Sequence, residues 1–336
     1  MKKISIIVPN FNNANFVMKC LNSIVSQKYK NKEIIVVDDG STDDSVKIIR
    51  KMMGSNKDIE IKLICQNNLN AAMARNKGME YATGDYVLFL DSDDLLEDDS
   101  LNMLIEKCEK YKGDFDLVVG GYEEIDGQGD VIGERAFANR DDIANSEKDF
   151  ATLIDIDPVP SNKLYNLKLI RKNHLQWGNV RIGQDLNFYL KYLALCKHVL
   201  IVKENIYKYR IGNNNSMSNS YDFRIFDIVN VFDDVKNFYS RRGLTGLYKE
   251  YMPVLALKHY NSQMSKLISF DGYKIRKTII DYFAINEKKI DYSVSKNKTK
   301  SSDKMRRKFR LKCFFGFVAA SSFYRRYKLR KKEIGS

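Results

Sequence analysis

Residues 85–94 read Asp-Tyr-Val-Leu-Phe-Leu-Asp-Ser-Asp-Asp, an apolar run that ends in three carboxylates. The run at 86–90 is rich in aromatic and branched side chains, which is typical of a buried β-strand. Taking a carboxylate out of water is costly unless a cation or hydrogen-bond donors receive it. The stretch therefore predicts either a divalent-cation site of the Asp-x-Asp type or a solvated acidic turn that caps a helix starting near Asp98.

A second acidic turn lies upstream. The apolar run at 33–37 is followed at 38–44 by Asp-Asp-Gly-Ser-Thr-Asp-Asp. We expect Ser41 or Thr42 to N-cap the helix that continues through Met53. Open parallel sheets bind ligands outside the carboxyl ends of their strands, so the two acidic turns are expected to face one crevice.

The first 120 residues alternate short apolar runs with amphipathic segments. Strands are predicted at 4–8, 34–37, 59–65, 86–90 and 115–119, and helices at about 14–27, 43–53, 71–82 and 98–111. This alternation predicts an α/β fold with a doubly wound, mainly parallel sheet. The first strand is not followed by Gly-x-Gly-x-x-Gly or by a Walker loop, so the usual nicotinamide and P-loop sites lack their signatures.

Four sequence blocks together resemble family 2 glycosyltransferases of the GT-A fold, of the bacterial surface-polysaccharide type. They are Ser-Ile-Ile-Val-Pro-Asn-Phe-Asn at 5–12, Val-Asp-Asp-Gly-Ser-Thr-Asp at 37–43, Ala-Arg-Asn-Lys-Gly at 74–78 and Asp-Ser-Asp-Asp at 91–94. Four blocks in register are far more specific than any one of them. The resemblance extends more weakly to about residue 215, and it implies the GT-A sheet with a helical C-terminal extension.

The resemblance also implies a binding site for a UDP-sugar. Asp39 would accept the uracil N3–H, and Pro9 and Phe11 would line the base pocket. Arg75 would lie near the nucleotide and its partner carboxylates, and Asp91 would lie near the ribose and the donor sugar.

The same resemblance implies a metal ion and one departure from the family pattern. Asp93, with Asp91 as a candidate second ligand, would hold Mn²⁺ or Mg²⁺ on the diphosphate and neutralise charge on the departing UDP. The departure is the loop at 66–72, which stands where many relatives have a Gly-Gly pair. Asn70 tolerates left-handed backbone better than Leu69, so we expect a reshaped turn.

An inverting transfer also requires a carboxylate that deprotonates the acceptor hydroxyl. Residues 183–188, Gly-Gln-Asp-Leu-Asn-Phe, resemble the family's Gly-Glu-Asp-x-x-Phe block, which implies Asp185 as the base. Gln184 replaces the usual Glu and removes a negative neighbour. The alternative is that Asp185 only favours the N-terminus of a helix.

Further blocks are expected to complete the cleft. We expect residues 161–165 and 174–177 on the acceptor side, with Lys163 either as a solvated stem or in contact with a phosphate or an acidic sugar. Residues 207–210 predict a strand, and residues 213–218 predict a polar mobile loop that closes over the donor.

Composition bounds the domain organisation of the 336 residues. We predict a catalytic domain at 1–215 (donor half about 1–120, acceptor half about 121–215), a helical extension at 216–285 and a basic tail at 286–336. The five cysteines are odd in number, which is typical of reduced thiols. With no signal peptide and no apolar run of about 18 residues, we expect a cytoplasmic protein.

The positive charge is concentrated at the C-terminus. Residues 286–336 hold 17 Lys and Arg against 4 Asp and Glu, so they carry the whole formal charge of +13. Within 304–332, basic blocks flank an uncharged core at 313–320, which indicates an interfacial helix on anionic lipid. Nucleic acid is the alternative, but tracking phosphates needs no apolar core, so none is expected as a partner. The predicted location is peripheral, on the inner face of the plasma membrane.

These observations predict a metal-dependent, inverting glycosyltransferase. It would move a sugar from a UDP-sugar to a hydroxyl of a lipid-linked oligosaccharide in capsule or other surface polysaccharide synthesis. The alternatives are a nucleotidyltransferase, which would release diphosphate rather than UDP, and a catalytically silent membrane or nucleic-acid binding protein of the same fold.

Overall fold

The structure is a computed structural model that describes residues 1–212, 223–265, 273–291, 307 and 309. Its residues cluster into two compact units. The first unit holds residues 1–179 and 184–212, and the second holds residues 180–183 together with the described residues from 223 onward. The chain therefore leaves the first unit after Asn179 and returns to it at Gln184.

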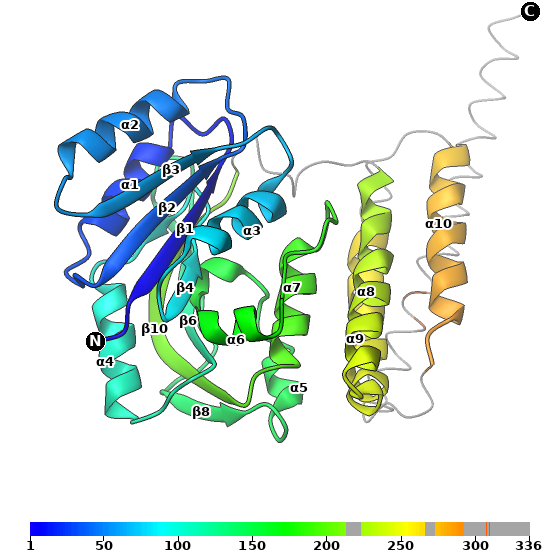
Figure 1. The fold of residues 1–336 in the computed structure, drawn as a ribbon. Helices are drawn as coiled ribbons and strands as arrows, with labels where there is room; N and C mark the ends of the chain where they lie inside the picture. The colour runs from blue at the N-terminus through cyan, green and yellow to red at the C-terminus, as the bar shows by residue number, and fades with distance from the viewer. Residues whose placement is uncertain (213–222, 266–272, 292–306, 308, 310–336) are drawn as a thin grey trace, which may run out of the picture. The chain divides into compact units, whose positions relative to one another are not determined.

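The first part of the sheet is parallel, as the βαβ alternation predicted. The strands run in the order β3-β2-β1-β4, and β1 pairs in parallel with both β2 and β4 (Figure 1). The strands are β1 (Ile4–Asn10), β2 (Lys32–Asp38), β3 (Glu60–Cys65) and β4 (Tyr86–Phe89), joined by the helices α1 (Val17–Val25), α2 (Ser45–Ser55) and α3 (Ala71–Tyr81). The carboxyl ends of these strands therefore meet at one edge of the sheet.

Strand β1 is covered on both faces because its successive side chains point to opposite sides. Ile4, Ile6 and Val8 share one core with buried residues of α1 and α2. On the other face Ile7 meets α3, where a Cβ added to Gly78 would lie 2.4 Å from the Ile7 Cγ2 atom. Helix α3 therefore approaches β1 more closely than any larger residue at position 78 would allow.

The second part of the sheet is mixed. Strand β9 (Lys163–Asn166) lies between β4 and β6 and is antiparallel to both, whereas β6 (Leu117–Ile125) and β10 (His198–Arg210) are parallel. The remaining elements of this unit are β5 (Leu95–Leu96), β7 (Val131–Arg135), β8 (Asp142–Asn145), α4 (Ser100–Lys110), α5 (Phe150–Leu153), η1 (Pro160–Asn162), α6 (Leu167–Lys172) and α7 (Gln184–Leu193). The predicted parallel character is confirmed for β1 to β4, and the sheet as a whole is a mixed α/β sheet.

The predicted N-cap of α2 is wrong. The helix begins at Ser45 with Asp44 at the N-cap position and no side-chain capping bond. Ser41 instead donates its hydroxyl to Asp38 Oδ2 at 2.6 Å. The helix begins four residues after Ser41, whose hydroxyl oxygen accepts the N–H of Asn12 at 2.9 Å instead of a helix N–H.

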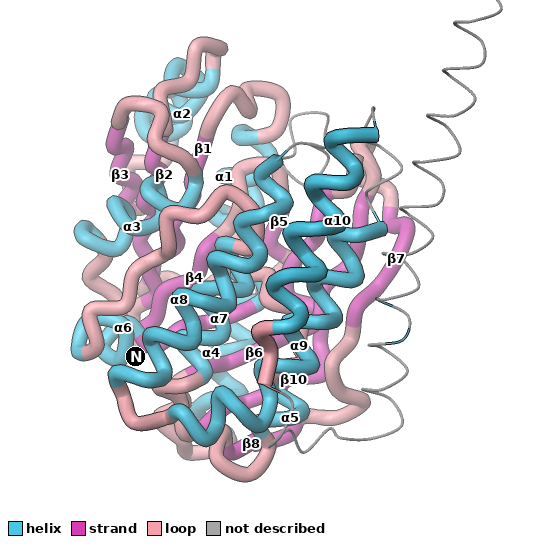
Figure 2. The backbone as a smooth tube through the Cα atoms, turned by 90° about the vertical axis from the view of Figure 1, so that its right-hand side faces the viewer, coloured by secondary structure: helices cyan, strands magenta, loops and turns pink. Residues whose placement is uncertain are grey.

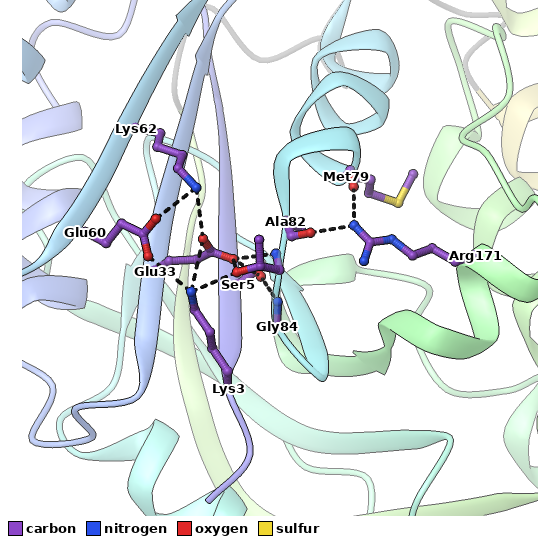
Figure 3. Close-up of polar contacts among 10 residues, drawn as sticks. Lys3, Ser5, Glu33, Glu60, Lys62, Met79, Ala82, Gly84 and Arg171 are labelled. Carbon is purple, nitrogen blue, oxygen red and sulfur yellow. Dashed lines mark hydrogen bonds and ion pairs between the residues drawn. The ribbon is translucent and has the colours of Figure 1, made fainter.

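A buried carboxylate ties the start of β2 to its neighbours (Figure 3). Glu33 accepts hydrogen bonds from Ser5 Oγ at 2.6 Å and from the N–H and hydroxyl of Thr83 at 2.6 and 2.9 Å. The ammonium groups of Lys3 and Lys62 lie 3.4 and 3.3 Å from Glu33 Oε2. Burial raises the pKa of Glu33, but the hydrogen bonds from Ser5 and Thr83 and the charge of Lys3 outweigh it and lower the pKa to about 2.

Replacing this carboxylate should make stability less dependent on pH. The folded pKa of about 2 lies below the ordinary glutamate value of 4.5, so ionised Glu33 stabilises the fold fully above pH 4.5 and progressively less as the pH falls towards 2. We expect Glu33→Gln to lower the free energy of unfolding by about 2–3 kcal/mol at pH 7, with the difference shrinking below pH 4.5. Urea unfolding at several pH values measures this difference.

The matched control for that prediction is Glu60→Gln. Glu60 pairs with the same two lysines, at 3.1 Å from Lys3 and 2.9 Å from Lys62, but its side chain is 47% exposed. Exposed ion pairs contribute less than about 1 kcal/mol. Equal losses of stability for the two variants would contradict the role of the buried carboxylate.

In its described part, the second unit consists of η3 (Phe223–Phe226) and the helices α8 (Asp227–Arg241), α9 (Thr245–Ser265) and α10 (Tyr273–Lys288), with α9 in contact with both α8 and α10 (Figure 2). On α8 the apolar residues Val229, Phe232, Val235 and Phe238 recur every three positions and are buried. The helical character predicted for this extension is confirmed, and these residues form the buried face of α8.

Two predictions concern segments that lie almost entirely outside the described residues. The loop at 213–218 and the tail at 304–332 lie outside the described residues, apart from Arg307, which is exposed, and Phe309, which is buried. Across the described helices, none combines the length and the apolar character that crossing a membrane would require.

Candidate active site

Helix α3 carries Arg75 and is fixed at both ends. Asn70 adopts a positive φ of +99° and its side chain accepts a backbone N–H of the first turn at 3.2 Å. At the other end, Arg171 of α6 donates to the carbonyls of Met79 and Ala82 (Figure 3). Asn70 thus adopts a positive φ, which asparagine tolerates better than leucine, and its N–H donates to Asp39 Oδ2 at 2.8 Å, which places the start of α3 beside the acidic turn after β2.

Arg75 joins two acidic residues that are 94 positions apart in the sequence. Its Nη2 atom lies 2.6 Å from Asp91 Oδ1, and its Nη1 atom lies 3.4 Å from Asp185 Oδ1. The Arg75 side chain is 4% exposed, whereas those of Asp91 and Asp185 are 37% and 41% exposed. A buried guanidinium therefore holds two carboxylates that both reach solvent.

The electrostatics of this array follow from burial and from the pairing. Burial lowers the pKa of Arg75, but Asp91 and Asp185 outweigh it and keep the pKa above its ordinary value. Burial raises the pKa of Asp185 and Asp91 adds to it, while the Arg75 charge opposes both. Asp185 is consequently a stronger base than an ordinary aspartate.

Two stacked aromatic rings pack against the guanidinium of Arg75 on the side of Trp177. The guanidinium carbon of Arg75 lies 4.5 Å from the ring centre of Trp177, and Trp177 stacks on Phe188 of α7 at 4.2 Å. Asn76 exchanges two hydrogen bonds with the backbone of Trp177, at 2.8 and 3.1 Å. We expected residues 174–177 to line the acceptor side, but Trp177 is 2% exposed and packs beneath Arg75.

The acidic turn after β4 is hydrogen-bonded to Arg210, to which the sequence analysis gave no role in the site. Asp94 is 1% exposed and accepts the N–H of Arg210 at 2.8 Å, and the Arg210 guanidinium donates to the carbonyl of Asp93 at 2.8 Å. Helix α4 begins later, at Ser100, and its N-cap residue Asp99 makes no side-chain capping bond. The alternative of an acidic turn that caps this helix is therefore wrong.

The carboxylates of the turn after β4 and of α7 all act on the pKa of one aromatic residue, Tyr209. Burial raises the pKa of Tyr209 to about 12, and the carboxylates of Asp94, Asp91, Asp93 and Asp185 add to this shift. The ion pairs of Arg75 with Asp91 and Asp185 independently place the start of α7 beside the turn after β4.

Asp39 follows β2 and organises the loop before α3. Its Oδ1 atom accepts hydrogen bonds at 2.8 Å from Gln66 Nε2 and the N–H of Leu69, and its Oδ2 atom accepts the N–H of Asn70 at 2.8 Å. The loop that departs from the family pattern is thus folded around this carboxylate. A carboxylate accepts about four hydrogen bonds, so these three contacts leave one acceptor position on Oδ2 of this residue, which is 3% exposed.

Pro9 and Phe11 lie where β1 ends. Pro9 is buried within the strand, and Phe11 directly after it is 41% exposed. In the sheet register Asn10 is opposite Asp38, which places Phe11 and Asp39 just past the ends of neighbouring strands. An exposed aromatic ring beside a carboxylate suits a flat base with an N–H donor.

The expectation of a solvated stem for Lys163 is wrong. The residue is fully buried, and its ammonium donates to the carbonyls of Asp157 and Val159 and to Asn162 Oδ1 at 2.6–2.7 Å. Burial lowers the pKa of Lys163 to about 7, against the opposing charges of Asp157 and Asp185. Lys163 therefore fixes the turn before β9 from within, and no sequence pattern indicated this.

The residues of the turn fit a metal ion that is shared with a substrate. Asp91 and Asp93 supply carboxylates on one turn, and Mn²⁺ or Mg²⁺ binds to one or two protein carboxylates and completes its shell with water and phosphate oxygens. Among the residues that the structure describes, no three His, Cys, Asp or Glu side chains gather into a metal site of their own. The donor set fits a cation on a diphosphate and does not fit a zinc site with three or four protein ligands.

Known protein sequences that resemble this chain belong to glycosyltransferases. A model of glycosyl transferase family 2 matches residues 5–173, half of the chain. The glycosyltransferase GlyA of Streptococcus pneumoniae is 35% identical over 223 residues, which cover 62% of this chain and 30% of GlyA. TarP, a poly(ribitol-phosphate) beta-N-acetylglucosaminyltransferase of Staphylococcus aureus, is 28% identical over 230 residues, which cover 66% of each chain. The match thus spans less than a third of the length of GlyA.

Among solved structures, residues 1–349 of S. aureus TarS in complex with UDP-GlcNAc align with a TM-score of 0.70. The alignment covers 96% of this chain and 92% of that chain at 17% identity, so it is a likeness of fold. The matched family model begins in β1, ends just after α6 and includes both acidic turns and Arg75. On these grounds the chain belongs to glycosyltransferase family 2 and has the GT-A fold.

Proposed function

We propose that this chain is a metal-dependent, inverting glycosyltransferase that moves a sugar from a UDP-sugar to a hydroxyl of a lipid-linked oligosaccharide, in capsule or other surface polysaccharide synthesis. The observation that carries the proposal is Arg75, which joins Asp91 of the turn after β4 to Asp185 of α7. An inverting transfer needs a donor-side charge and a base on opposite faces of one sugar ring. In this proposal Asp91 lies on the donor side and Asp185 is the base, and both carboxylates contact the guanidinium of Arg75.

In this proposal the nucleotide lies across the carboxyl ends of β1, β2 and β4. Pro9 and Phe11 pack against the uracil, and Asp39 accepts its N3–H on the remaining acceptor position of Oδ2. Asp93, with Asp91 as a candidate second ligand, would hold Mn²⁺ or Mg²⁺ at the turn after β4. The bound cation supplies positive charge where negative charge develops on the departing UDP.

Asp185 acts on the acceptor. The acceptor oxygen attacks the anomeric carbon from the face opposite UDP, the bond from that carbon to the phosphate oxygen breaks, and its electron pair leaves with UDP. Asp185 takes the proton of the acceptor hydroxyl. Its side chain is 41% exposed, so it can meet an acceptor, and its raised pKa makes it a better base than an ordinary aspartate.

The direct test is incubation of the full chain with a panel of UDP-sugars and Mn²⁺, with free UDP as the readout. We expect slow UDP release with one or a few of these donors, and faster release when a lipid-linked saccharide is added. Release of diphosphate from a nucleoside triphosphate and a sugar phosphate would instead support a nucleotidyltransferase. No turnover and no UDP binding would favour a silent binding protein.

The basic tail gives a prediction about the acceptor. Truncation after residue 300 should release the protein from anionic vesicles and slow transfer to a lipid-linked acceptor, while donor hydrolysis stays nearly unchanged. Each cation near an anionic surface contributes on the order of 1 kcal/mol, and the attraction weakens as salt rises. Vesicle sedimentation at several salt concentrations measures the binding.

A paired variant separates insertion from simple attraction. Phe314→Asp with Phe317→Asp disrupts the apolar core and leaves most of the positive charge, so vesicle binding should fall if the tail inserts. Binding that survives this change and is lost when Arg325 and Arg326 are neutralised would contradict insertion. Preference of the intact chain for RNA over anionic vesicles would contradict the membrane prediction altogether.

A further inference from the structure

The turn after β4 alternates between residues that reach solvent and residues that do not. Asp91 and Asp93, the candidate metal ligands, are half-buried, whereas Ser92 and Asp94 are 2% and 1% exposed. Two of the four side chains therefore point into the protein, where neighbouring elements can hold them. The other two remain within reach of a cation at the surface of the turn.

The hydroxyl of Ser92 is held by the loop between β1 and α1. Asn13 Nδ2 donates a hydrogen bond to Ser92 Oγ at 2.8 Å, across 79 positions of the chain. The same part of the chain contacts the turn a second time, because the thiol of Cys20 on α1 donates to the carbonyl of Asp91 at 3.6 Å. A thiol is a weak donor, so the amide of Asn13 makes the stronger of these two contacts.

Asn13 can hold the turn because its own backbone is fixed. Its N–H donates to the hydroxyl of Ser45, the first residue of α2, at 3.2 Å, and the N–H of Ala14 donates to Asp43 Oδ2 at 2.8 Å. Its carbonyl accepts the N–H of Val17, the first residue of α1, at 2.9 Å. The loop after β1 is thus bound both to the start of α1 and to the acidic turn after β2, which keeps the Asn13 amide in place.

We propose that Asn13 positions the metal ligands: by holding the buried hydroxyl of Ser92, it sets the direction in which Asp91 and Asp93 present their carboxylates to the cation. The inference rests on the proposed metal-dependent function. Asn13 touches neither the cation nor the substrate, so it is a positioning residue. Loss of a residue that orients metal ligands typically lowers metal affinity by about 10–100-fold.

The loop that carries Asn13 also serves the other end of the proposed donor site. Phe11, which offers its ring to the base, lies two positions before Asn13, just after the end of β1. Asp39, the proposed partner of the base, is held by its own hydrogen bonds to the loop before α3. Loss of the Asn13 side chain should therefore weaken metal binding and leave metal-free UDP binding unchanged.

The first test measures Mn²⁺ binding without turnover. The full chain is titrated with Mn²⁺ at saturating UDP, and the electron paramagnetic resonance signal of free Mn²⁺ gives the Kd after correction for the UDP–Mn²⁺ complex measured without protein. We expect Asn13→Ala and Ser92→Ala each to raise this Kd about tenfold, with the Kd for UDP in EDTA within about twofold of wild type. Asn15→Ala, which removes an exposed asparagine of the same loop, is the matched control and should change neither constant.

The second test asks whether the two residues act through one contact. If they do, the double variant Asn13→Ala with Ser92→Ala should raise the Kd for Mn²⁺ no more than about tenfold, whereas independent effects would multiply to about 100-fold. Thermal unfolding reports the fold separately, because a merely structural role would lower Tm and leave the Kd of the folded protein unchanged. That result, multiplied effects in the double variant, or a wild-type Kd in both single variants would overturn the inference.

Asp93→Asn, measured in the same titration, separates this inference from the proposed function. If Asp93→Asn loses Mn²⁺ binding while Asn13→Ala and Ser92→Ala keep the wild-type Kd, the metal assignment stands and the role of Asn13 is wrong. If Asp93→Asn binds Mn²⁺ as tightly as the wild type does, the metal assignment itself fails, and the inference fails with it.

Discussion

Asp93→Asn is expected to abolish sugar transfer, with a loss of about 10³-fold or more, and to abolish the metal-dependent part of UDP binding. The change keeps the size of the side chain and removes the charge that a hard cation needs on this turn. Since Asp94 and the Arg210 backbone hold the turn itself, the fold should stay intact. Transfer assays with and without Mn²⁺, together with UDP titration, measure both effects.

The control for this prediction is Asp58→Asn, which removes one exposed carboxylate of the same unit that lies before the amino end of β3, whereas the acidic turns follow the carboxyl ends of β2 and β4. It should leave transfer and metal dependence at wild-type levels. Full activity of the wild-type chain in excess EDTA would show that the reaction needs no divalent cation, and the role given to Asp93 would then be wrong.

The second large effect is expected for Asp185→Asn, which should lower kcat by about 10² or more and leave the Kd for UDP near the wild-type value. An asparagine keeps the shape of the side chain but cannot accept the proton of the acceptor hydroxyl. Because burial raises the pKa of Asp185, the rate of the wild-type enzyme should begin to rise at a higher pH than an ordinary aspartate would give.

The outcome that would contradict this assignment is loss of UDP affinity with unchanged turnover. Asp185 would then serve the donor through its contact with Arg75. Steady-state kinetics with separate variation of donor and acceptor distinguish the two cases, since a missing base acts on kcat whereas a missing donor contact acts on KM for the UDP-sugar.

The local patterns of the chain were sufficient for the first half of the fold. Strands β1, β2 and β4 each contain an apolar run and end at a polar turn, and a parallel sheet places those turns at one edge. The acidic turns that carry Asp39 and Asp91 could therefore be assigned to one crevice before any contact was known, whereas only the resemblance to the family placed Arg75 there. The boundaries of these elements differ from the predicted ones by only a few residues.

What could not be predicted depends on contacts between distant parts of the chain. Arg210 supports the turn at Asp93 and Asp94 from 116 and 117 positions away, and nothing local at the end of β10 distinguishes it from an exposed arginine. Lys163 presents the same difficulty, because its burial depends on the turn before β9 folding back over it. The antiparallel insertion of β9 beside β4 likewise has no signature in its four residues.

The close approach of Gly78 to Ile7 has a consequence for recognising chains of this design. Arg75 and Gly78 are three positions apart on α3, so the residue that brings the helix against β1 also sets how far the guanidinium reaches. A chain with the arginine but with alanine or a larger residue at the glycine position would need either α3 or the side chain at position 7 to move, because an added Cβ would lie 2.4 Å from Ile7 Cγ2. The spacing Arg-x-x-Gly is thus a structural unit, and an alignment that matches the arginine alone is weak grounds for inferring the same pairing.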